Sequence, residues 1–163
     1  MFKKILFPVD LAHAEFAAGF ASDVERIADT CGAQIELMTA VPGFGMAIVA
    51  SYFPPETEQR ALRDMDARLR AFAQESFNRP VNCSVTLGTH WKRIVDTAKA
   101  KQIDLIVMPH CDKGWPESML LGSCTQKVTE RAPCSVLMLR PIDHATCPTS
   151  TRSTLPSTRH NLR

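Results

Sequence analysis

A nearly continuous apolar run stands at Ile103-Asp104-Leu105-Ile106-Val107-Met108. Such a run is typical of a strand that is buried on both faces of a sheet, as parallel strands usually are. Similar short apolar runs lie on both sides of it along the chain, at residues 3–9, 33–41, 81–87 and 134–139. The sequence therefore predicts five strands, of which residues 103–108 form the fourth.

Segments with the periodicity of helices separate these runs. Residues 14–31 place apolar side chains on one side at helical spacing, and Gly32 is a suitable stop for that helix. Three further helical segments are predicted at residues 56–77, 89–101 and 119–131. Because helices connect successive strands, we expect a doubly wound α/β fold with a parallel sheet and right-handed crossovers. The ligand crevice of such a sheet lies at the carboxyl ends of its strands.

Length and composition limit the class of protein. The chain has 163 residues, of which 45% are hydrophobic and 22% are charged, so one globular domain is expected and wholesale disorder is excluded. No apolar run approaches the roughly 18–20 residues of a membrane span, and the first residues do not resemble a signal peptide. We therefore expect a cytoplasmic protein without a membrane span.

The net charge of +2 arises from the end of the chain. From residue 144 onward the only formal charges are those of Arg152, Arg159 and Arg163, and without them the chain carries a net charge of −1. The sequence therefore does not predict a broad positively charged face, and this argues against nucleic acid as a partner. Residues 143–163 are rich in Ser, Thr, Arg and Pro, and we expect them to form a disordered tail after a domain of residues 1–142.

The six cysteines form no C-x-x-C pair, which excludes the usual zinc-ribbon and thioredoxin spacings. Reduced thiols are expected in a cytoplasmic protein. Cys83 and Cys134 lie in apolar runs and are predicted to be buried structural thiols without a redox role.

Few residues have the pattern of a chemical site. Asp10 ends the first strand, where a carboxylate either binds ribose hydroxyls or caps the helix that starts at Ala14; both roles stay open. Gly122-Ser123 opens a helix and is suited to hold a phosphate. Trp91 and Trp115 either stack on a base or pack against the protein. His110 lacks the further ligands that a metal site needs, and neither a P-loop nor a G-x-G-x-x-G motif occurs.

Five segments in register resemble the universal stress protein family. They are Lys4-Ile5-Leu6-Phe7-Pro8-Val9-Asp10, Val85-Thr86-Leu87-Gly88, Asp104-Leu105-Ile106-Val107-Met108, Leu120-Leu121-Gly122-Ser123 and Arg131-Ala132-Pro133-Cys134-Ser135-Val136-Leu137. The resemblance covers about residues 2–141. It implies a Rossmann-like fold of the adenine-nucleotide α-hydrolase type with strand order 3-2-1-4-5. It also implies a homodimer that pairs through the last strand, Cys134 to Leu139.

The same resemblance implies a site for ATP or ADP, with Mg²⁺ accompanying the nucleotide. By position, residues at the strand ends would contact the adenosine, and residues around the following helix would meet the phosphates. The nucleoside set is Pro8, Val9, Asp10, Ala40 and Met108; the phosphate set is His110, Lys113, Gly122, Ser123 and Cys124.

The phosphate loop departs from the family pattern, because Pro109 and Asp112 stand where two glycines are usual. Proline has no N–H to donate, and a lost hydrogen bond to a charged group costs about 1.5–3 kcal/mol. An aspartate adds repulsion toward phosphate. This change weakens the expected nucleotide site.

The leading hypothesis is a cytoplasmic stress-response dimer that binds ATP or ADP as a regulatory ligand and is not an enzyme. One alternative is a nucleotide-free dimeric scaffold that contacts other proteins. Another is a slow ATPase or autophosphorylating protein, for which His110 and Lys113 are the candidate groups.

Overall fold

The computed structural model describes residues 1–41, 55–110 and 123–141 and has strand β1 (Lys4–Pro8) at the centre of its sheet. β1 pairs in parallel with β2 (Gln34–Val41) on one side and with β4 (Leu105–Pro109) on the other. β3 (Asn82–Leu87) extends the sheet beyond β2, and β5 (Ser135–Leu139) extends it beyond β4. The order β3-β2-β1-β4-β5 confirms the predicted parallel sheet.

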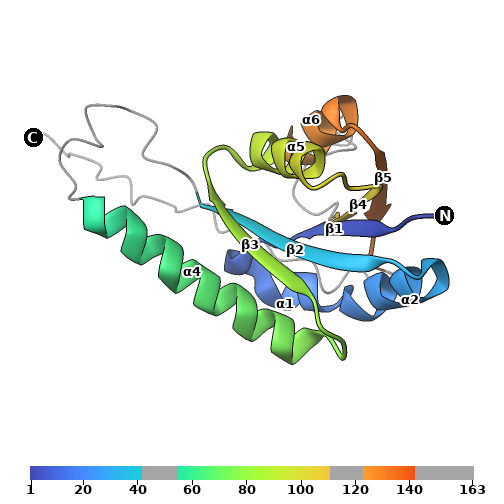
Figure 1. Ribbon diagram of the computed structural model, residues 1–163, viewed down its shortest axis with the longest axis horizontal. Coiled ribbons are helices and arrows are strands. Elements are labelled where there is room, and N and C mark those ends of the chain that lie inside the picture. The colour runs from blue at the N-terminus through green and yellow to red at the C-terminus, as the bar shows by residue number, and fades with distance from the viewer. Residues whose placement is uncertain (42–54, 111–122, 142–163) are drawn as a thin grey trace, which may run out of the picture.

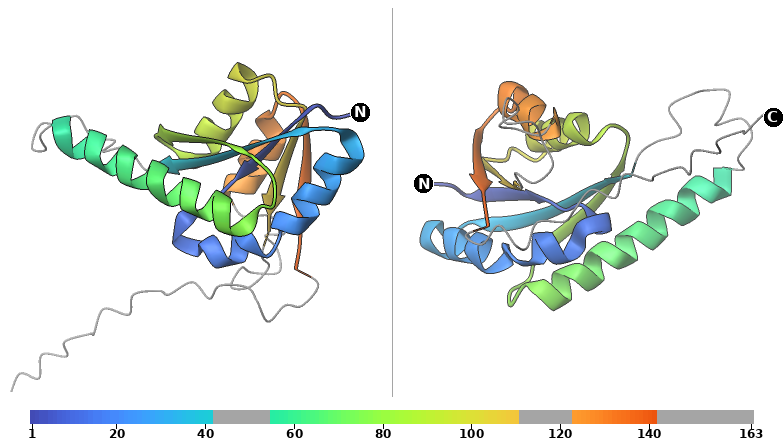
Figure 2. Two further views of the ribbon diagram at one scale, coloured as in Figure 1. Left: turned by 60° about the horizontal axis from the view of Figure 1, so that its bottom comes forward. Right: turned by 180° about the vertical axis from the view of Figure 1, so that it is seen from behind.

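Helices cover both faces of this sheet (Figure 1). One face is covered by α1 (Ala14–Ala18), α2 (Ala21–Cys31) and the long helix α4 (Pro55–Ser76). The other face is covered by α5 (His90–Ala100) and α6 (Ser123–Arg131). Figure 2 shows these two layers of helices, with the sheet between them, in two further views. The fold is therefore the doubly wound α/β class that the sequence predicts.

Most side chains of β1 and β4 are apolar because both faces of the sheet are buried there. Ile5 and Phe7 pack on the α1, α2 and α4 side, whereas Leu6 between them packs on the α5 and α6 side, and all three side chains are fully buried. In β4, Val107 and Ile106 are divided between the same two clusters. Burying each such side chain contributes about 1.5–3 kcal/mol, so the core holds the strand ends in fixed positions.

The predicted continuous helix over residues 14–31 is wrong. It is divided into α1 and α2 at Gly19 and Phe20, where the N–H of Phe20 donates to the carbonyl of Ala17, three residues earlier, at 3.1 Å. This tighter bond interrupts the helix without moving Phe20 off the buried face. Phe20 still packs edge-to-face on Phe16, with 5.2 Å between the ring centroids.

The other predicted boundaries need small corrections. The fourth strand starts at Leu105 rather than Ile103, because the Asp104 carboxylate accepts the N–H groups of Lys3 at 2.7 Å and Lys4 at 2.9 Å and so fixes the entry to the sheet. The described part of the last helix begins at Ser123; its predicted start at residues 119–122, like the predicted tail at 143–163, lies outside the described residues.

The cysteines are less buried than predicted. Cys83 and Cys134 are only half-buried, because each belongs to an edge of the sheet; burial nevertheless raises the pKa of both thiols. Cys31, Cys83, Cys124 and Cys134, which lie within the described ranges, are free thiols.

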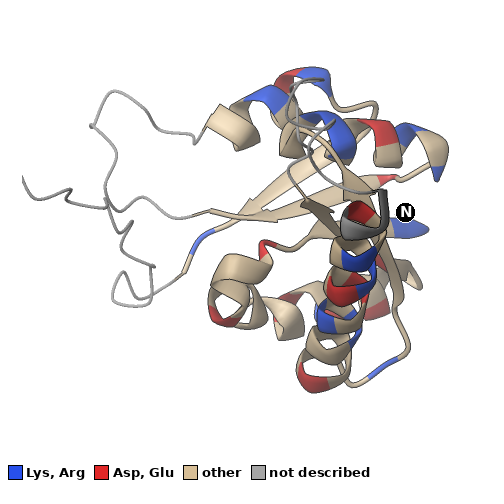
Figure 3. Cartoon of the chain, turned by 90° about the vertical axis from the view of Figure 1, so that its left-hand side faces the viewer, with Lys and Arg blue, Asp and Glu red and all other residues tan. Residues whose placement is uncertain are grey.

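Charged side chains of both signs are interspersed along α4 (Figure 3). One contact between them joins Arg70 Nε to Asp66 Oδ2 at 2.7 Å, one turn apart. Among the helices that the structure describes, none combines the length and apolar character needed to cross a membrane.

Gly88 connects β3 to helix α5. Its N–H donates to the carbonyl of Val41 at 2.8 Å, and its φ of 130° lies in a region that side chains rarely adopt. A Cβ at this position would lie 2.9 Å from Nε of Arg93. The absence of a side chain here therefore lets the start of α5 approach the ends of β2 and β3.

We predict that Gly88→Ala lowers the free energy of unfolding by at least about 1–2 kcal/mol, the cost of a left-handed backbone with a Cβ. Gly19→Ala is the matched control, because Gly19 has a helical φ of −58° and its added Cβ would meet ordinary neighbours. That change is expected to be neutral or stabilising by up to about 1 kcal/mol. Urea unfolding measures both, and equal effects would contradict this account of Gly88.

Candidate functional site

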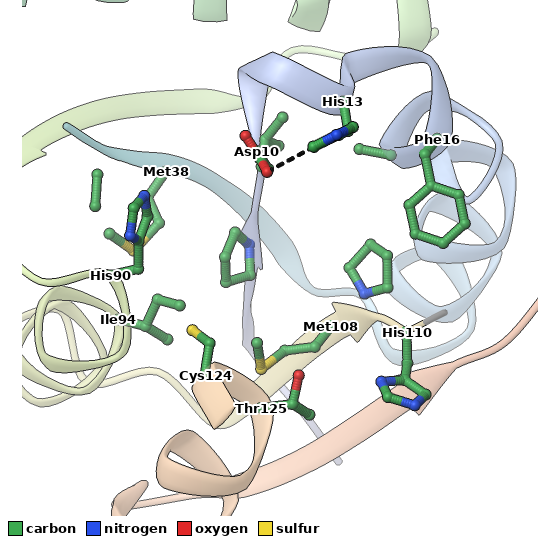
Figure 4. Close-up of a pocket in the computed structure, with 15 residues that line it drawn as sticks. Asp10, His13, Phe16, Met38, His90, Ile94, Met108, His110, Cys124 and Thr125 are labelled. Carbon is green, nitrogen blue, oxygen red and sulfur yellow. Dashed lines mark hydrogen bonds and ion pairs between the residues drawn. The ribbon is translucent and has the colours of Figure 1, made fainter. Parts of the chain in front are cut away.

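A cavity of about 410 Å³ lies at the carboxyl ends of β1, β2 and β4 (Figure 4). The strand order reverses direction between β1 and β4, which is the place where open α/β sheets bind ligands. Much of the lining is apolar and comes from several elements; it includes Phe16 of α1, Met38 of β2, Ile94 of α5 and Met108 of β4. The volume falls in the range of small-molecule sites.

Asp10 stands at the rim of this cavity, directly after β1. Its Oδ1 accepts the N–H of Ala12 at 2.9 Å, and its Oδ2 lies 2.9 Å from Nδ1 of His13. Asp10 thus caps the short 3-10 helix η1 (Leu11–His13) rather than the helix starting at Ala14, which corrects the predicted cap. Each carboxylate oxygen keeps a second lone pair that a ligand hydroxyl group can use.

The pKa of Asp10 is lowered by these contacts. Partial burial acts in the opposite direction and is the largest single influence, but the hydrogen bonds from His13 and Ala12, together with the nearby charges of His13 and His90, outweigh it. Asp10 is therefore ionised at neutral pH and brings a negative charge to the rim.

Three histidines line the cavity from three elements. His13 comes from η1, His90 begins α5, and His110 follows β4. The side chain of His110 is buried, and its backbone N–H donates to the carbonyl of Leu139 at 2.8 Å, which joins the end of β4 to the end of β5.

The structure brings most of the predicted site residues together. Those that line the cavity are Pro8, Val9, Asp10, Ala40, Met108, His110 and Cys124. Ser123 is the exposed first residue of α6 and does not line the cavity. Lys113 and Gly122, as well as Asp112, lie outside the described residues.

Sequence reasoning missed several lining residues, including His13, Met38, His90 and Thr125. Of these residues, only His13 could have been predicted from the sequence. It follows Asp10 by three residues, so one helical turn brings its ring within reach of the Asp10 carboxylate. The others depend on how α5 and α6 pack on the sheet.

Trp91 does not line the cavity and instead meets two cations of α6. Lys127 Nζ lies 5.7 Å and the Arg131 guanidinium 5.2 Å from its ring centroid. The packing interpretation therefore holds for Trp91, whereas Trp115 lies outside the described residues. Within the described ranges, no three His, Cys, Asp or Glu side chains are grouped so as to hold a metal ion.

We predict that Asp10→Asn lowers the melting temperature at pH 7. A carboxyl group whose pKa is lowered in the folded state stabilises the protein above its unfolded pKa, and this contribution is lost as the pH falls through the folded pKa. The difference between the two proteins should therefore narrow as the pH falls below 3.8, the usual pKa of an aspartate side chain.

Asp23→Asn on α2 is the control for this prediction, because Asp23 is a partly exposed acid whose nearest cation, Arg26, is 3.9 Å away. It should change the melting temperature less than Asp10→Asn does. Thermal unfolding followed by circular dichroism from pH 2.5 to 8 measures both, and parallel curves for the two variants would contradict the role given to Asp10.

Known proteins resemble this chain in sequence and in fold. A protein of Thermus aquaticus described as a universal stress protein is 31% identical over 141 residues, which cover 86% of this chain and 100% of the relative. The structure resembles universal stress protein UspA from Lactobacillus plantarum with a TM-score of 0.60 and 25% identity, over 85% of this chain and 97% of that one.

A further solved structure is a universal stress protein in complex with cAMP, with a TM-score of 0.55 and 19% identity over 85% of this chain and 97% of that one. At this level of identity the likeness shows the fold alone. The family model of the universal stress proteins matches residues 1–140, which include every described strand. The chain therefore belongs to the universal stress protein family.

Proposed function

We propose that this protein binds ATP or ADP in the cavity as a regulatory ligand and acts as a cytoplasmic stress-response dimer. The observation that supports this most directly is the position of the cavity: it lies where the strand order reverses, with an ionised Asp10 at its rim. The solved relative that binds cAMP supports an adenine nucleotide as the class of ligand.

The nucleoside end of the ligand fits the cavity. Met38, Ala40, Ile94 and Met108 give apolar surface for a flat base. The free lone pairs of Asp10 are suited to accept hydrogen bonds from the ribose hydroxyl groups. Val9 is held in place by its N–H, which donates to the carbonyl of Met38 at 2.8 Å, so the two strand ends that line the cavity are fixed to each other.

The residues expected at the phosphate end of the ligand favour binding less strongly. The start of α6, where Ser123 and Cys124 lie, is expected to offer backbone N–H groups and the positive end of a helix dipole to the phosphates. Pro109 ends β4 and has no N–H, so at least one hydrogen bond of the usual glycine loop is lost, at about 1.5–3 kcal/mol. We expect binding roughly 10–100-fold weaker than with a glycine there. Lys113, Gly122 and Mg²⁺ stay predicted contributors.

We propose that the ligand is held rather than turned over. Phosphoryl transfer needs a positioned base and a cationic clamp on the phosphates. His110 is at the cavity, but the lining that the structure describes includes no lysine or arginine to act as the clamp. Metal-dependent ATP hydrolysis that is lost in both His110→Ala and Lys113→Ala would favour the enzymatic alternative.

The dimer is proposed to form through β5. This strand pairs with β4 along one edge, and Leu137 leaves 37% of its surface exposed. An apolar strand at the edge of a sheet tends to pair with another chain unless it is covered. A second copy placed against β5 would cover it, and the scaffold alternative would use the same edge.

For the ligand, we predict that about 1 mM ATP with Mg²⁺ raises the melting temperature. A ligand that binds the folded state alone stabilises it by about 4 kcal/mol at 1,000 times its Kd and by about 2.7 kcal/mol at 100 times. Asp10→Ala should remove most of the shift, whereas Asp23→Ala should keep it. No shift in the unmodified protein at millimolar ligand would leave the nucleotide-free scaffold as the working model.

For the dimer, we predict that Leu137→Asp gives a monomer at micromolar concentration in light scattering after size-exclusion chromatography. A charge in the centre of the paired edge is costly to desolvate. Gln126→Asp on the exposed surface of α6 is the control and should stay dimeric. A Leu137→Asp protein that is folded by circular dichroism and still dimeric would place the interface elsewhere.

A further inference from the structure

The source of positive charge in the cavity is unusual for a site that takes phosphates. In the part of its lining that the structure describes, the side chains able to carry a positive charge are His13, His90 and His110; neither lysine nor arginine is among them. Asp10 is the one carboxylate of the same lining. With neutral imidazoles the described lining therefore carries one negative charge, which repels a phosphate.

His13 lies at the cavity with its ring in contact with Asp10. Its Nδ1 lies 2.9 Å from Oδ2 of Asp10. A protonated imidazole donates from both nitrogens, so Nδ1 can stay on Asp10 while Nε2 donates to a ligand. Protonation of His13 would also neutralise the charge of Asp10 at the rim.

His90 reaches the same rim from another element. It is the first residue of α5, and it is near enough to Asp10 to act on its charge. Figure 4 shows His13 and His90 coming from separate elements toward the cavity, with His110 at the end of β4. The three histidines are therefore distributed around the cavity rather than placed in one loop.

Apart from His13, His90 and His110, the groups around the cavity that the structure describes do not ordinarily change charge in the same range. On α6, burial raises the pKa of the Cys124 thiol, although the nearby Lys127 acts against this, and the thiol stays neutral. Lys127 itself lies against the ring of Trp91, and Arg93 of α5 pairs with Asp96 at 3.7 Å. The described lining from α1 and β2 is uncharged. Histidine is the side chain that ordinarily changes charge between pH 5 and 8.

We propose that His13 and His90 select a phosphorylated nucleoside over the uncharged nucleoside, and that this selection strengthens as the pH falls from 8 to 5.5. The inference rests on the proposed function of the cavity and adds the groups that recognise the anion. Protonated imidazoles would then supply donors to the phosphate in place of the backbone N–H that Pro109 lacks.

The test compares cAMP with adenosine by calorimetry at pH 5.5 and 8.0 and at constant ionic strength. cAMP has a single phosphodiester charge that does not titrate in this range, and adenosine is uncharged, so the ratio of their Kd values isolates the contribution of the protein's histidines. We expect the ratio to favour cAMP about tenfold more at pH 5.5 than at pH 8.0. The double variant His13→Gln, His90→Gln should lose most of this pH dependence, and what is left is the contribution of His110.

Lys92→Gln is the matched control, because Lys92 is an exposed cation on α5 that does not line the cavity, and it should keep the pH response. If the double variant does not fold, the histidine ring signals of the unmodified protein give a second measurement by NMR. By linkage, cAMP should raise the pKa of both His13 and His90, whereas adenosine should not.

The outcomes separate the two proposals. If both ligands bind with a ratio that is independent of pH, or if cAMP shifts neither His13 nor His90, the inference is overturned and the proposed nucleotide site stands. If neither ligand binds at either pH, the inference is overturned, and the shift in melting temperature with ATP decides separately whether the proposed nucleotide site stands.

Discussion

The rest of the structure depends on the pairing of β1 with β4. These strands lie side by side in parallel, with Ile5 opposite Leu105 and Leu6 opposite Ile106, although about 100 residues separate them in the chain. After β1 the chain turns to α1 on one face of the sheet, and the next described helix after β4, α6, lies on the other face. Because α1 and α6 lie on opposite faces of the sheet, neither helix covers the ends of β1 and β4 between them. The cavity is a consequence of that topology.

The same residues serve the fold and the cavity. Asp10 caps η1 and orients His13, and its charge is stabilised by those contacts. Val9 holds the end of β1 to β2, while Gly88 allows α5 to bring His90 to the rim. A substitution at any of these positions acts on stability and on the site together. For this reason, ligand-induced shifts in stability are more informative about the site than changes in activity or stability alone.

The sequence predicts the sheet well because burial on both faces requires strands that are mostly apolar. The sequence does not reveal the break in the helix at Gly19 and Phe20. There the backbone N–H bonds to the carbonyl three residues earlier instead of four, but the same side chains stay buried, so the helical spacing of apolar residues is unchanged. In the cavity, Asp10 is predictable because it directly follows a strand. His90 is not, because its orientation depends on the packing of α5 against a sheet that is assembled from distant segments.

One backbone contact relates the two parts of the proposed function. His110, the residue at the cavity after β4, donates its N–H to Leu139, the last residue of β5, and β5 is the edge proposed to pair with a second copy. A ligand that favours one position of the end of β4 would therefore act on the dimer edge through this hydrogen bond and through the pairing of β4 with β5. Linkage makes such an effect reciprocal: if nucleotide strengthens the dimer by some factor, dimerisation strengthens nucleotide binding by the same factor. A regulatory ligand that is not consumed needs a relation of this kind, because its occupancy has an effect only through a second equilibrium that it biases.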